Sequence, residues 1–449
     1  MERTLIKKNL LSRNISYKII KESEKSNKQL SLIINKYFNL NESLLKNIDK
    51  RFITMLVQGT VRLSGRLDWM LRKVYHGNFN KLRTDLKILL RIGSYQVLYM
   101  DKIPNHAAVG TTVELTKMIH KNFASLSNAI LRSLIRSSDF IIPEKNSSIF
   151  EISEYLSHPE WLIKKWINDK GFYETLKISE WNNQIPLFWF RVNKNLYDID
   201  SFKSYLERMN IEYEQFLDMK EYFKISKHQD IINSEIFKKG YLYVQDPSAG
   251  LVVRLLNPKP GDIVTDACAA PGGKTSYISE ILNNKSKIFS HDSNVLRFNQ
   301  LENNLLRLNT KNVSSKLIDV STSHLEMSDK ILLDVPCSGT GVISKKPDIR
   351  WRRSENEISE MNILQMQILC NASKYINPGG VIVYSTCSIE PEENDMIIDS
   401  FLENHKSFTL EAADLYISKK FTDKIGYLRT NSFYHKIDGG FAARLKYNA

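Results

Sequence analysis

Apolar residues recur three and four positions apart through the first third of the chain. One such run contains Leu86, Leu89, Leu90, Ile92, Tyr95, Leu98 and Tyr99. This is the spacing of one face of an α-helix. Similar runs extend over 113–119 and 126–135, proline is scarce, and no alternating stretch of strand length stands out. The pattern predicts a small helix bundle over residues 1–140.

The pattern changes twice further along. Pro143 and the polar residues 146–148 interrupt it, and SHPEWLIKKW (157–166) is predicted to start a short helix. Between 186 and about 217, an apolar run (LFWFRVN), a helical segment (SFKSYLERMN) and a further short strand predict a small α+β domain. We place this linker and domain at 141–238.

From residue 239 to 449, short apolar runs alternate with helical segments. Strands are predicted at 263–265, 287–290, 316–318, 330–334 and 380–384. Strands that alternate with helices predict an α/β domain with a mainly parallel, doubly wound sheet. Ligands of such sheets bind beyond the carboxyl ends of the strands, so we expect a site there.

Charge divides the chain unevenly. Residues 1–140 contain 25 Lys and Arg against 10 Asp and Glu, a balance of +15, whereas the remainder contains 38 against 40, a balance of −2. The basic part favours a nucleic-acid partner. No apolar run of about 18 residues suggests a membrane span, and no secretory signal is evident.

Cysteine usage favours a reducing compartment. The chain has four cysteines, Cys268, Cys337, Cys370 and Cys387, and no CxxC pair. They are too few and too scattered for a disulfide scaffold or a structural zinc site. We therefore expect a cytoplasmic protein without a metal. Separately, we expect a monomer.

The stretch GDIVTDACAAPGGKTS (261–276) joins a strand to a glycine-rich turn and a helix, which is a typical anion or nucleotide site. A P-loop would need glycine where Cys268 stands, and the dinucleotide fingerprint G-x-G-x-x-G is absent. The remaining interpretation is S-adenosylmethionine, held by turn amides. Asp292 after the second strand suits its ribose and Asp319 after the third suits its adenine, although either acid alone could be a cap.

Two cysteines follow later strands, in Asp334-Val335-Pro336-Cys337 and Ser385-Thr386-Cys387. A lone cysteine in such a place usually packs inertly, but two at one sheet end indicate chemistry. A thiolate is a strong nucleophile that can activate a substrate by adding to it covalently. Cys268 is better explained as a small buried residue.

A basic segment with one tryptophan, KKPDIRWRR (345–353), comes soon after the Pro-Cys turn. Basic side chains can position phosphates and an aromatic ring can stack a base; the alternative is an ordinary basic helix start. The predicted RNA contacts are Lys345, Lys346, Arg350, Trp351 and Arg352.

These motifs resemble a known family. CAAPGGKT, LLDVPCSGTG and YSTCSIEPEEN are similar to motifs of RNA cytosine-C5 methyltransferases. The segment 89–117 followed by NAILRSLIR resembles the NusB-type RNA-binding domain that precedes the catalytic part in the Fmu/Sun group of bacterial 16S ribosomal RNA methyltransferases. The middle part is similar to that group's ferredoxin-like module, and DGGFAARLKY resembles its closing strands, with Gly440 in place of a phenylalanine.

The resemblance implies a NusB-like bundle, a small α+β RNA-contact domain and a Rossmann-like methyltransferase domain. It implies methyl transfer from S-adenosylmethionine to cytosine C5 of 16S ribosomal RNA. Cys387 would be the nucleophile, Cys337 would resolve the adduct, and Asp334 would bind the N3/N4 edge of cytosine. The implied cofactor contacts are Cys268, Ala269, Ala270, Pro271, Gly272, Gly273, Lys274, Asp292, Asp319 and Asp334.

Other interpretations stay open at this point. DNA cytosine methyltransferases use the Pro-Cys thiol, so the two cysteines could exchange roles. The chain could also be a non-catalytic RNA-binding ribosome-assembly factor, although such a factor would have no need of paired thiols. An RNA-dependent ATPase is disfavoured by Cys268 at the required glycine.

Overall fold

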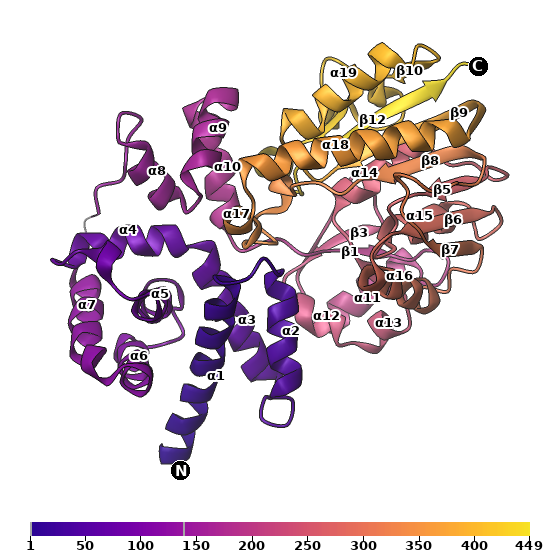
Figure 1. The fold of residues 1–449 in the computed structure, drawn as a ribbon. Helices are drawn as coiled ribbons and strands as arrows, with labels where there is room; N and C mark the ends of the chain where they lie inside the picture. The colour runs from indigo at the N-terminus through magenta and orange to yellow at the C-terminus, as the bar shows by residue number, and fades with distance from the viewer. Residues whose placement is uncertain (1, 138–139) are drawn as a thin grey trace. The chain divides into compact units, whose positions relative to one another are not determined.

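The computed structural model describes residues 2–137 and 140–449, which form two compact units (Figure 1). Unit 1 contains residues 1–185 and 343–353, and unit 2 contains 186–342 and 354–449. These units group two segments differently from the predicted domains. Residues 141–185 belong with the helical part, and the segment 343–353, predicted within the methyltransferase domain, belongs with it too.

Unit 1 is helical, as predicted. Its helices are α1 (Glu2–Ser23), α2 (Leu30–Leu40), α3 (Asn47–Arg62), α4 (Ser64–Val74), α5 (Thr84–Tyr99), α6 (Asn105–Ile119), α7 (Ala124–Arg136), α8 (Ile149–Leu156), α9 (Glu160–Lys170), α10 (Phe172–Asn183) and the single turn α17 (Ile349–Arg352). The spacing that predicted α5 is the reason for its packing: Ile88, Leu89 and Ile92 are fully buried against Leu56 and Val57 of α3. Each such side chain contributes about 2 kcal/mol by burial.

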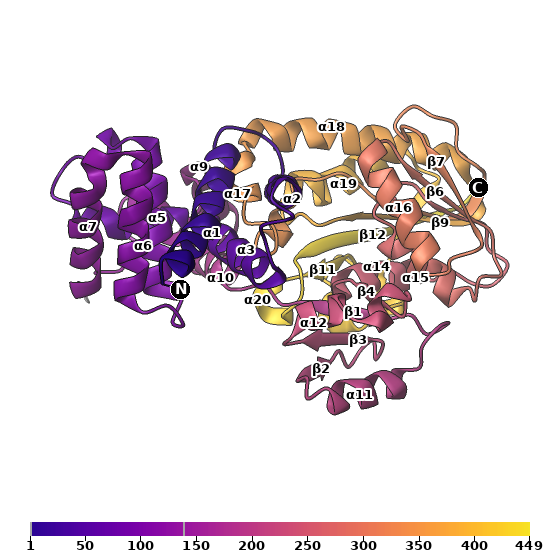
Figure 2. The ribbon, with the colours of Figure 1, turned by 90° about the horizontal axis from the view of Figure 1, so that it is seen from below.

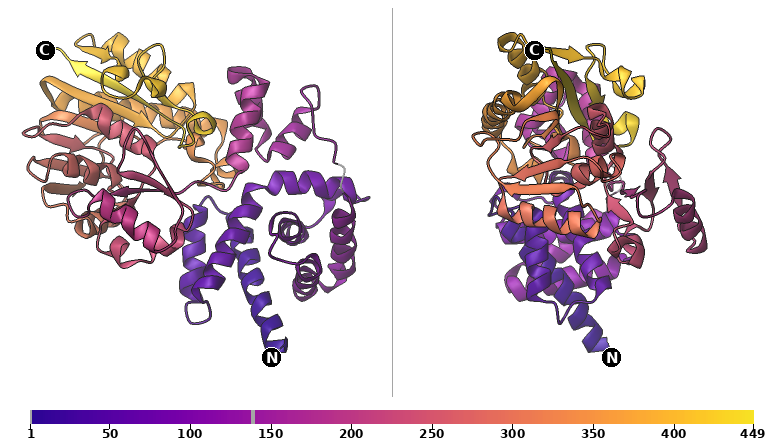
Figure 3. Two further views of the ribbon diagram at one scale, coloured as in Figure 1. Left: turned by 180° about the vertical axis from the view of Figure 1, so that it is seen from behind. Right: turned by 90° about the vertical axis from the view of Figure 1, so that its right-hand side faces the viewer.

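Unit 2 contains a small antiparallel sheet in the order β2-β3-β1-β4, which lies beside a larger sheet (Figures 2 and 3). Its elements are β1 (Trp189–Val192), α11 (Ile199–Arg208), β2 (Tyr213–Gln215), β3 (Tyr222–Ile225), α12 (His228–Ile232), α13 (Glu235–Lys238) and β4 (Leu242–Val244). The predicted strand, helix and strand are confirmed as β1, α11 and β2. Strand β4 pairs with β1, so the small sheet extends past the predicted boundary at residue 238, to Val244.

The larger sheet has the order β10-β12-β9-β8-β5-β6-β7, with β11 paired to β12. Its strands are β5 (Val264–Asp266), β6 (Ile288–Asp292), β7 (Val313–Leu317), β8 (Ser328–Asp334), β9 (Ile376–Thr386), β10 (Phe408–Glu411), β11 (Leu428–Thr430) and β12 (Gly440–Tyr447). The strands β5 to β9 are parallel and the last three are antiparallel to their partners. The five predicted strands and the mainly parallel sheet are therefore confirmed.

Helices cover both faces of this sheet (Figure 2). They are α14 (Pro247–Leu256), α15 (Gly273–Ile281), α16 (Val295–Arg307), α18 (Glu355–Ala372) and α19 (Asp395–Asn404), and a short α20 (Ser432–His435) precedes β12. Strand β8 shows why: Ile331 and Leu333 pack in one core with Leu369 of α18, whereas Leu332 packs in the opposite core with Leu251 of α14. The continuous apolar sequence of β8 reflects burial on both faces.

The strand order reverses at β5. The chain passes from β5 to β6 and β7 on one side and then returns to β8 and β9 on the other. A reversal of this kind leaves a crevice at the carboxyl ends of the two neighbouring strands. The residues that follow β5 and β8 are therefore placed to form a site.

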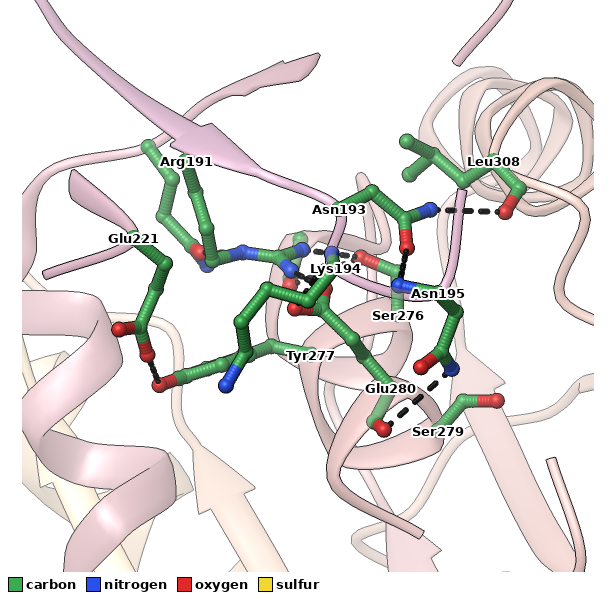
Figure 4. Close-up of polar contacts among 12 residues, drawn as sticks. Arg191, Asn193, Lys194, Asn195, Glu221, Ser276, Tyr277, Ser279, Glu280 and Leu308 are labelled. Carbon is green, nitrogen blue, oxygen red and sulfur yellow. Dashed lines mark hydrogen bonds and ion pairs between the residues drawn. The ribbon is translucent and has the colours of Figure 1, made fainter. Parts of the chain in front are cut away.

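A buried polar cluster joins β1 of the small sheet to α15 of the large domain (Figure 4). The Arg191 guanidinium pairs with the Glu280 carboxylate and donates to Ser276 Oγ at 2.9 Å. Both charged side chains are almost completely buried, with exposed fractions of 1% and 3%. The cluster fixes the small sheet against the helix that begins at the glycine-rich turn, which explains why the two form one unit.

Candidate active site

The glycine-rich turn follows β5 and leads into α15. Gly272 has a φ of +98°, a conformation that side chains with a Cβ rarely adopt. Helix α15 then starts at Gly273 beside a cavity of about 280 Å³. Residues that line this cavity include Cys268, Ala269, Ala270, Pro271, Gly273, Lys274, Asp334 and Cys387. Most of the predicted cofactor loop therefore faces one cavity together with the Thr-Cys cysteine.

Lys274 and Asp334 form an ion pair in the wall of this cavity. Lys274 Nζ lies 2.5 Å from Asp334 Oδ2, and Ser385 Oγ donates to Asp334 Oδ1 at 3.1 Å. Burial favours the neutral amine, but the attraction of Asp334 outweighs it, so the pKa of Lys274 is raised above its ordinary value. A permanent positive charge therefore stands in the cavity, and it also interacts electrostatically with Cys387.

The two predicted thiols lie together. Cys337 Sγ and Cys387 Sγ are 3.2 Å apart, although 50 residues separate them in the chain. The hydrogen bond to Cys387, followed by burial, raises the pKa of Cys337 well above its ordinary value. Cys337 therefore keeps its proton beside the sulfur of Cys387.

The loop after Cys387 holds the loop that carries Cys337. Glu393 is fully buried. Its carboxylate accepts two hydrogen bonds from Ser338, one from the backbone N–H at 2.7 Å and one from the hydroxyl at 2.5 Å. Asn394 accepts from Thr386 Oγ1 at 2.6 Å and donates to the Ser388 carbonyl at 3.1 Å. These bonds fix the spacing between the Pro-Cys and Thr-Cys turns. The sequence analysis missed Glu393, although it lies in the quoted run EPEEN.

Asp266, at the end of β5, is a second residue that the sequence analysis missed. It is completely buried and lines the cavity, and Thr275 Oγ1 donates to its Oδ2 at 2.7 Å. Its Oδ1 has no hydrogen-bond partner among the described residues. Burial raises the pKa of Asp266 to about 7. An acid after the first strand was the available signal, but its burial could not be read from the sequence.

Gln245 was also missed. Its Oε1 accepts from Arg191 Nε and from Tyr222 OH, both at 2.8 Å. Two donors on one oxygen fix which way the amide points. Gln245 lines the cavity beside Gly273, so the polar cluster of Figure 4 also supports a cavity wall.

The remaining cofactor candidates lie outside this lining. Asp292, at the end of β6, accepts from the backbone N–H groups of Ala270 at 3.2 Å and Asn294 at 3.0 Å, so it braces the glycine-rich turn. Asp319 is exposed after β7 and accepts from Ser321. Cys268, by contrast, lines the cavity; burial, followed by the neighbouring carboxylates, raises its pKa, as expected for a packing residue.

The predicted RNA-contact segment needs one correction. Arg350 is completely buried in unit 1 and donates to the backbone carbonyls of Arg62, Ser157 and Asn182. It stabilises this unit and does not face RNA. Arg352 pairs with Asp348 at 2.8 Å, whereas Lys346 and Trp351 are exposed and Lys345 is half-buried.

Within 2–137 and 140–449, no group of three or more ligand-type side chains could hold a metal ion. In the same part of the chain, no helix is both long and apolar enough to cross a membrane.

Comparison with known proteins identifies the family. A family described as 16S rRNA methyltransferase RsmB/F matches residues 253–446, the NusB family matches 11–136, and an RsmF/B-like ferredoxin-like domain matches 158–232. The probable ribosomal RNA small subunit methyltransferase B of Bacillus subtilis is 31% identical over 445 residues, covering 97% of this chain and 98% of the relative. The chain belongs to this methyltransferase family.

Two further proteins agree with this assignment. Ribosomal RNA small subunit methyltransferase B of Klebsiella pneumoniae is 31% identical over 411 residues, covering 91% of this chain and 93% of its own. The crystal structure of PH0851 has a TM-score of 0.78 at 26% identity and covers 97% of this chain and 98% of its own. The three-part fold is thus confirmed, and the chain is a ribosomal RNA methyltransferase that needs a methyl donor.

Replacing Asp266 by asparagine should raise the stability of this methyltransferase relative to the natural chain as the pH rises. The folded-state pKa is about 7, above the usual value, so ionisation costs folding free energy from about pH 4 upward and levels off above about pH 7. The free energy of unfolding of the variant should therefore rise relative to that of the natural chain by up to about 4 kcal/mol over that pH range. Urea denaturation at several pH values measures it, and a difference that does not change with pH would contradict it.

Proposed function

We propose that this methyltransferase transfers a methyl group from S-adenosylmethionine to C5 of a cytosine in 16S ribosomal RNA, through a covalent bond between Cys387 and C6. The observation that supports this most is the pair of thiols 3.2 Å apart, with Cys387 in the same cavity as the glycine-rich turn and the Lys274–Asp334 pair. We further propose that it acts as a monomer in the cytoplasm.

The residues around the cavity suit S-adenosylmethionine. The N-terminus of α15 attracts a carboxylate, and Asp292 at the end of β6 lies next to the turn, where a ribose would need an acceptor. Asp266 Oδ1, buried without a partner among the described residues, would be satisfied by a hydrogen-bond donor on the ligand. When bound, S-adenosylmethionine supplies an electrophilic methyl group.

In this mechanism each side chain has a separate task. Sγ of Cys387 bonds to C6 and pushes electron density to C5, which attacks the methyl group. Asp334 accepts from the N4 amino group, which uracil lacks, and so selects cytosine. A base then removes the C5 proton, the electrons of that bond re-form the C5–C6 double bond, and Cys387 leaves as a thiolate. Cys337 Sγ, 3.2 Å from that sulfur, is close enough to assist this step.

The direct test is methylation of protein-free 16S ribosomal RNA by the purified chain with S-adenosylmethionine, followed by bisulfite sequencing. A new 5-methylcytosine at one position supports the proposal. RNA binding without any methylated cytosine would favour the alternative, a non-catalytic assembly factor.

Replacing Asp334 by asparagine should lower kcat/KM for cytosine methylation by about 10²- to 10³-fold. The amide presents a donor where the N4 amino group needs an acceptor, and it leaves the buried Lys274 ammonium without its counter-charge. Transfer of labelled methyl groups to RNA measures the effect. Asp414→Asn, at an exposed acid of unit 2, is the matched control; equal loss in both variants would contradict the assignment.

A further inference from the structure

Unit 1 contains a cavity of about 760 Å³ that is separate from the candidate active site. Its walls come from the connection between α1 and α2, from α3, α4 and α8, and from the turn α17. A cavity of this size is in the range that holds small organic ligands. Unit 1 also carries the basic excess of the chain, so its ligand is worth identifying.

Trp351 of α17 forms a flat aromatic part of the wall. Its side chain is 40% exposed, and its Nε1–H donates to the Val61 carbonyl at 2.9 Å. That bond fixes the indole and occupies its only donor, so the ring presents a face rather than a polar group. Arg350, buried and bonded to three backbone carbonyls, holds the turn that carries it. A rigid, exposed indole face is suited to stacking on a planar ring.

Two hydroxyl groups of the wall have no hydrogen-bond partner in the described part of the chain. Thr60 Oγ1 and Ser26 Oγ are buried, and neither has a hydrogen-bond partner among the described residues. Thr60 is only 1% exposed. Buried hydroxyl groups are normally bonded, so these two favour a ligand that carries both donors and acceptors on its edge.

Most acids of the wall are already neutralised. Arg91 pairs with Asp68 and with Glu24, each at 2.6 Å, and Arg352 pairs with Asp348 at 2.8 Å. Glu154 pairs with Arg72 at 3.0 Å. The exposed charged residues that remain in the lining are Lys25, Lys28 and Glu160, which leaves a small basic excess.

We propose that this cavity binds one unpaired nucleotide of the RNA substrate, with its base against Trp351 and its phosphate near Lys25 and Lys28. A nucleotide has a planar ring that can stack on the indole, a polar edge that can bond to the two hydroxyl groups, and a negative charge that the lysines attract. This inference rests on the proposed function in taking ribosomal RNA as the substrate. It adds a recognition site in unit 1 whose lining shares no residue with the cavity that contains Cys387.

The first test measures binding of protein-free 16S ribosomal RNA to the full chain by filter retention. Each variant is made in the Cys387→Ala background without methyl donor, so that no covalent bond contributes. Trp351→Ala should weaken binding about tenfold, and Trp351→Phe should restore most of it because a ring is retained. Unchanged affinity of the Trp351→Ala chain, with an unchanged melting temperature, would overturn the proposal.

The phosphate end is tested with a pair of lysines. Lys28→Gln should weaken RNA binding and flatten its dependence on salt, because one phosphate contact is lost. Lys102→Gln, at another exposed lysine of unit 1, is the control and should do so less. Equal effects of the two changes would show that only the general basic charge of the unit matters, against a specific site.

The natural chain gives a test that does not depend on the stability of any variant. Ultraviolet cross-linking to 16S ribosomal RNA, followed by peptide mapping, should link a nucleotide to Trp351. If no cross-link falls on the wall of this cavity, the site is rejected. It is also rejected if free nucleotides saturate the cavity and RNA does not compete with them for binding.

The proposed function is measured separately, by covalent capture of RNA that contains 5-fluorocytosine. Cross-links at Trp351 without covalent capture would support the nucleotide site and reject the catalytic proposal. If covalent capture is unaffected by Trp351→Ala and no cross-link forms at Trp351, the catalytic proposal is supported and the nucleotide site is rejected.

Discussion

Replacing Cys387 by alanine should abolish methylation, lowering its rate by at least about 10⁴-fold, and should also abolish covalent capture of 5-fluorocytosine RNA. Both results are expected because the C6 adduct needs a nucleophilic sulfur and no side-chain methyl group can replace it. Cys387 lines the cavity, and the neighbouring Cys337 is held as a protonated thiol. Transfer of labelled methyl groups and gel-shift of the covalent complex measure the two effects.

The same experiment decides between the two thiols. Cys337→Ala should still capture RNA but release it slowly, so that covalent complexes accumulate. If the Cys387→Ala chain captures RNA and the Cys337→Ala chain does not, the roles are reversed. Cys370→Ala is the matched control, because Cys370 is a half-buried cysteine of α18 that does not line the cavity.

Replacing Arg191 by alanine should destabilise the protein by about 3–5 kcal/mol, because it leaves the buried Glu280 carboxylate without a counter-charge. Burial already raises the pKa of Glu280 above its usual value, even with the arginine present. The change also removes a donor to Gln245 in the cavity wall and one to Ser276 of α15. Loss of the small-sheet contact should therefore lower cofactor affinity as well as stability.

Urea denaturation of the full chain measures this loss. The double variant Arg191→Met, Glu280→Gln should be more stable than Arg191→Met alone, since no uncompensated charge stays buried. Lys238→Met removes one partner of an exposed ion pair with Glu235 and should change stability little. If Arg191→Ala and Lys238→Met lowered the free energy of unfolding by the same amount, the buried cluster would not be what joins the small sheet to α15.

The sequence predicted the fold well because most of the evidence for it is local. Helical spacing around Leu89 located α5, short apolar runs located the five parallel strands, and the glycine-rich turn located the start of α15. Strand boundaries moved by a few residues, as at β9, because pairing with neighbouring strands extends a strand past its apolar run. The misassigned and missed site residues have another cause: the sequence does not show which side chains are buried or which groups they contact.

Arg350 shows this most clearly. Its neighbours in the chain are basic, which favoured an RNA contact, but its partners are carbonyl groups of residues 62, 157 and 182. Residue spacing in the chain carries no information on contacts of this kind. Asp266 is the corresponding case in the active site, since its raised pKa comes from burial by segments far along the chain.

The sequence alone thus determined the three-part architecture, the strand–turn–helix beside the cavity, and which two cysteines follow strands of one sheet. Periodicity and turn chemistry depend on neighbouring residues, so they can be read directly. Only the tertiary structure brought Cys337 and Cys387 within 3.2 Å, buried Arg350 and Asp266, and placed residues 343–353 in unit 1. Those features depend on the packing of distant segments, which decides what is desolvated and which polar groups meet.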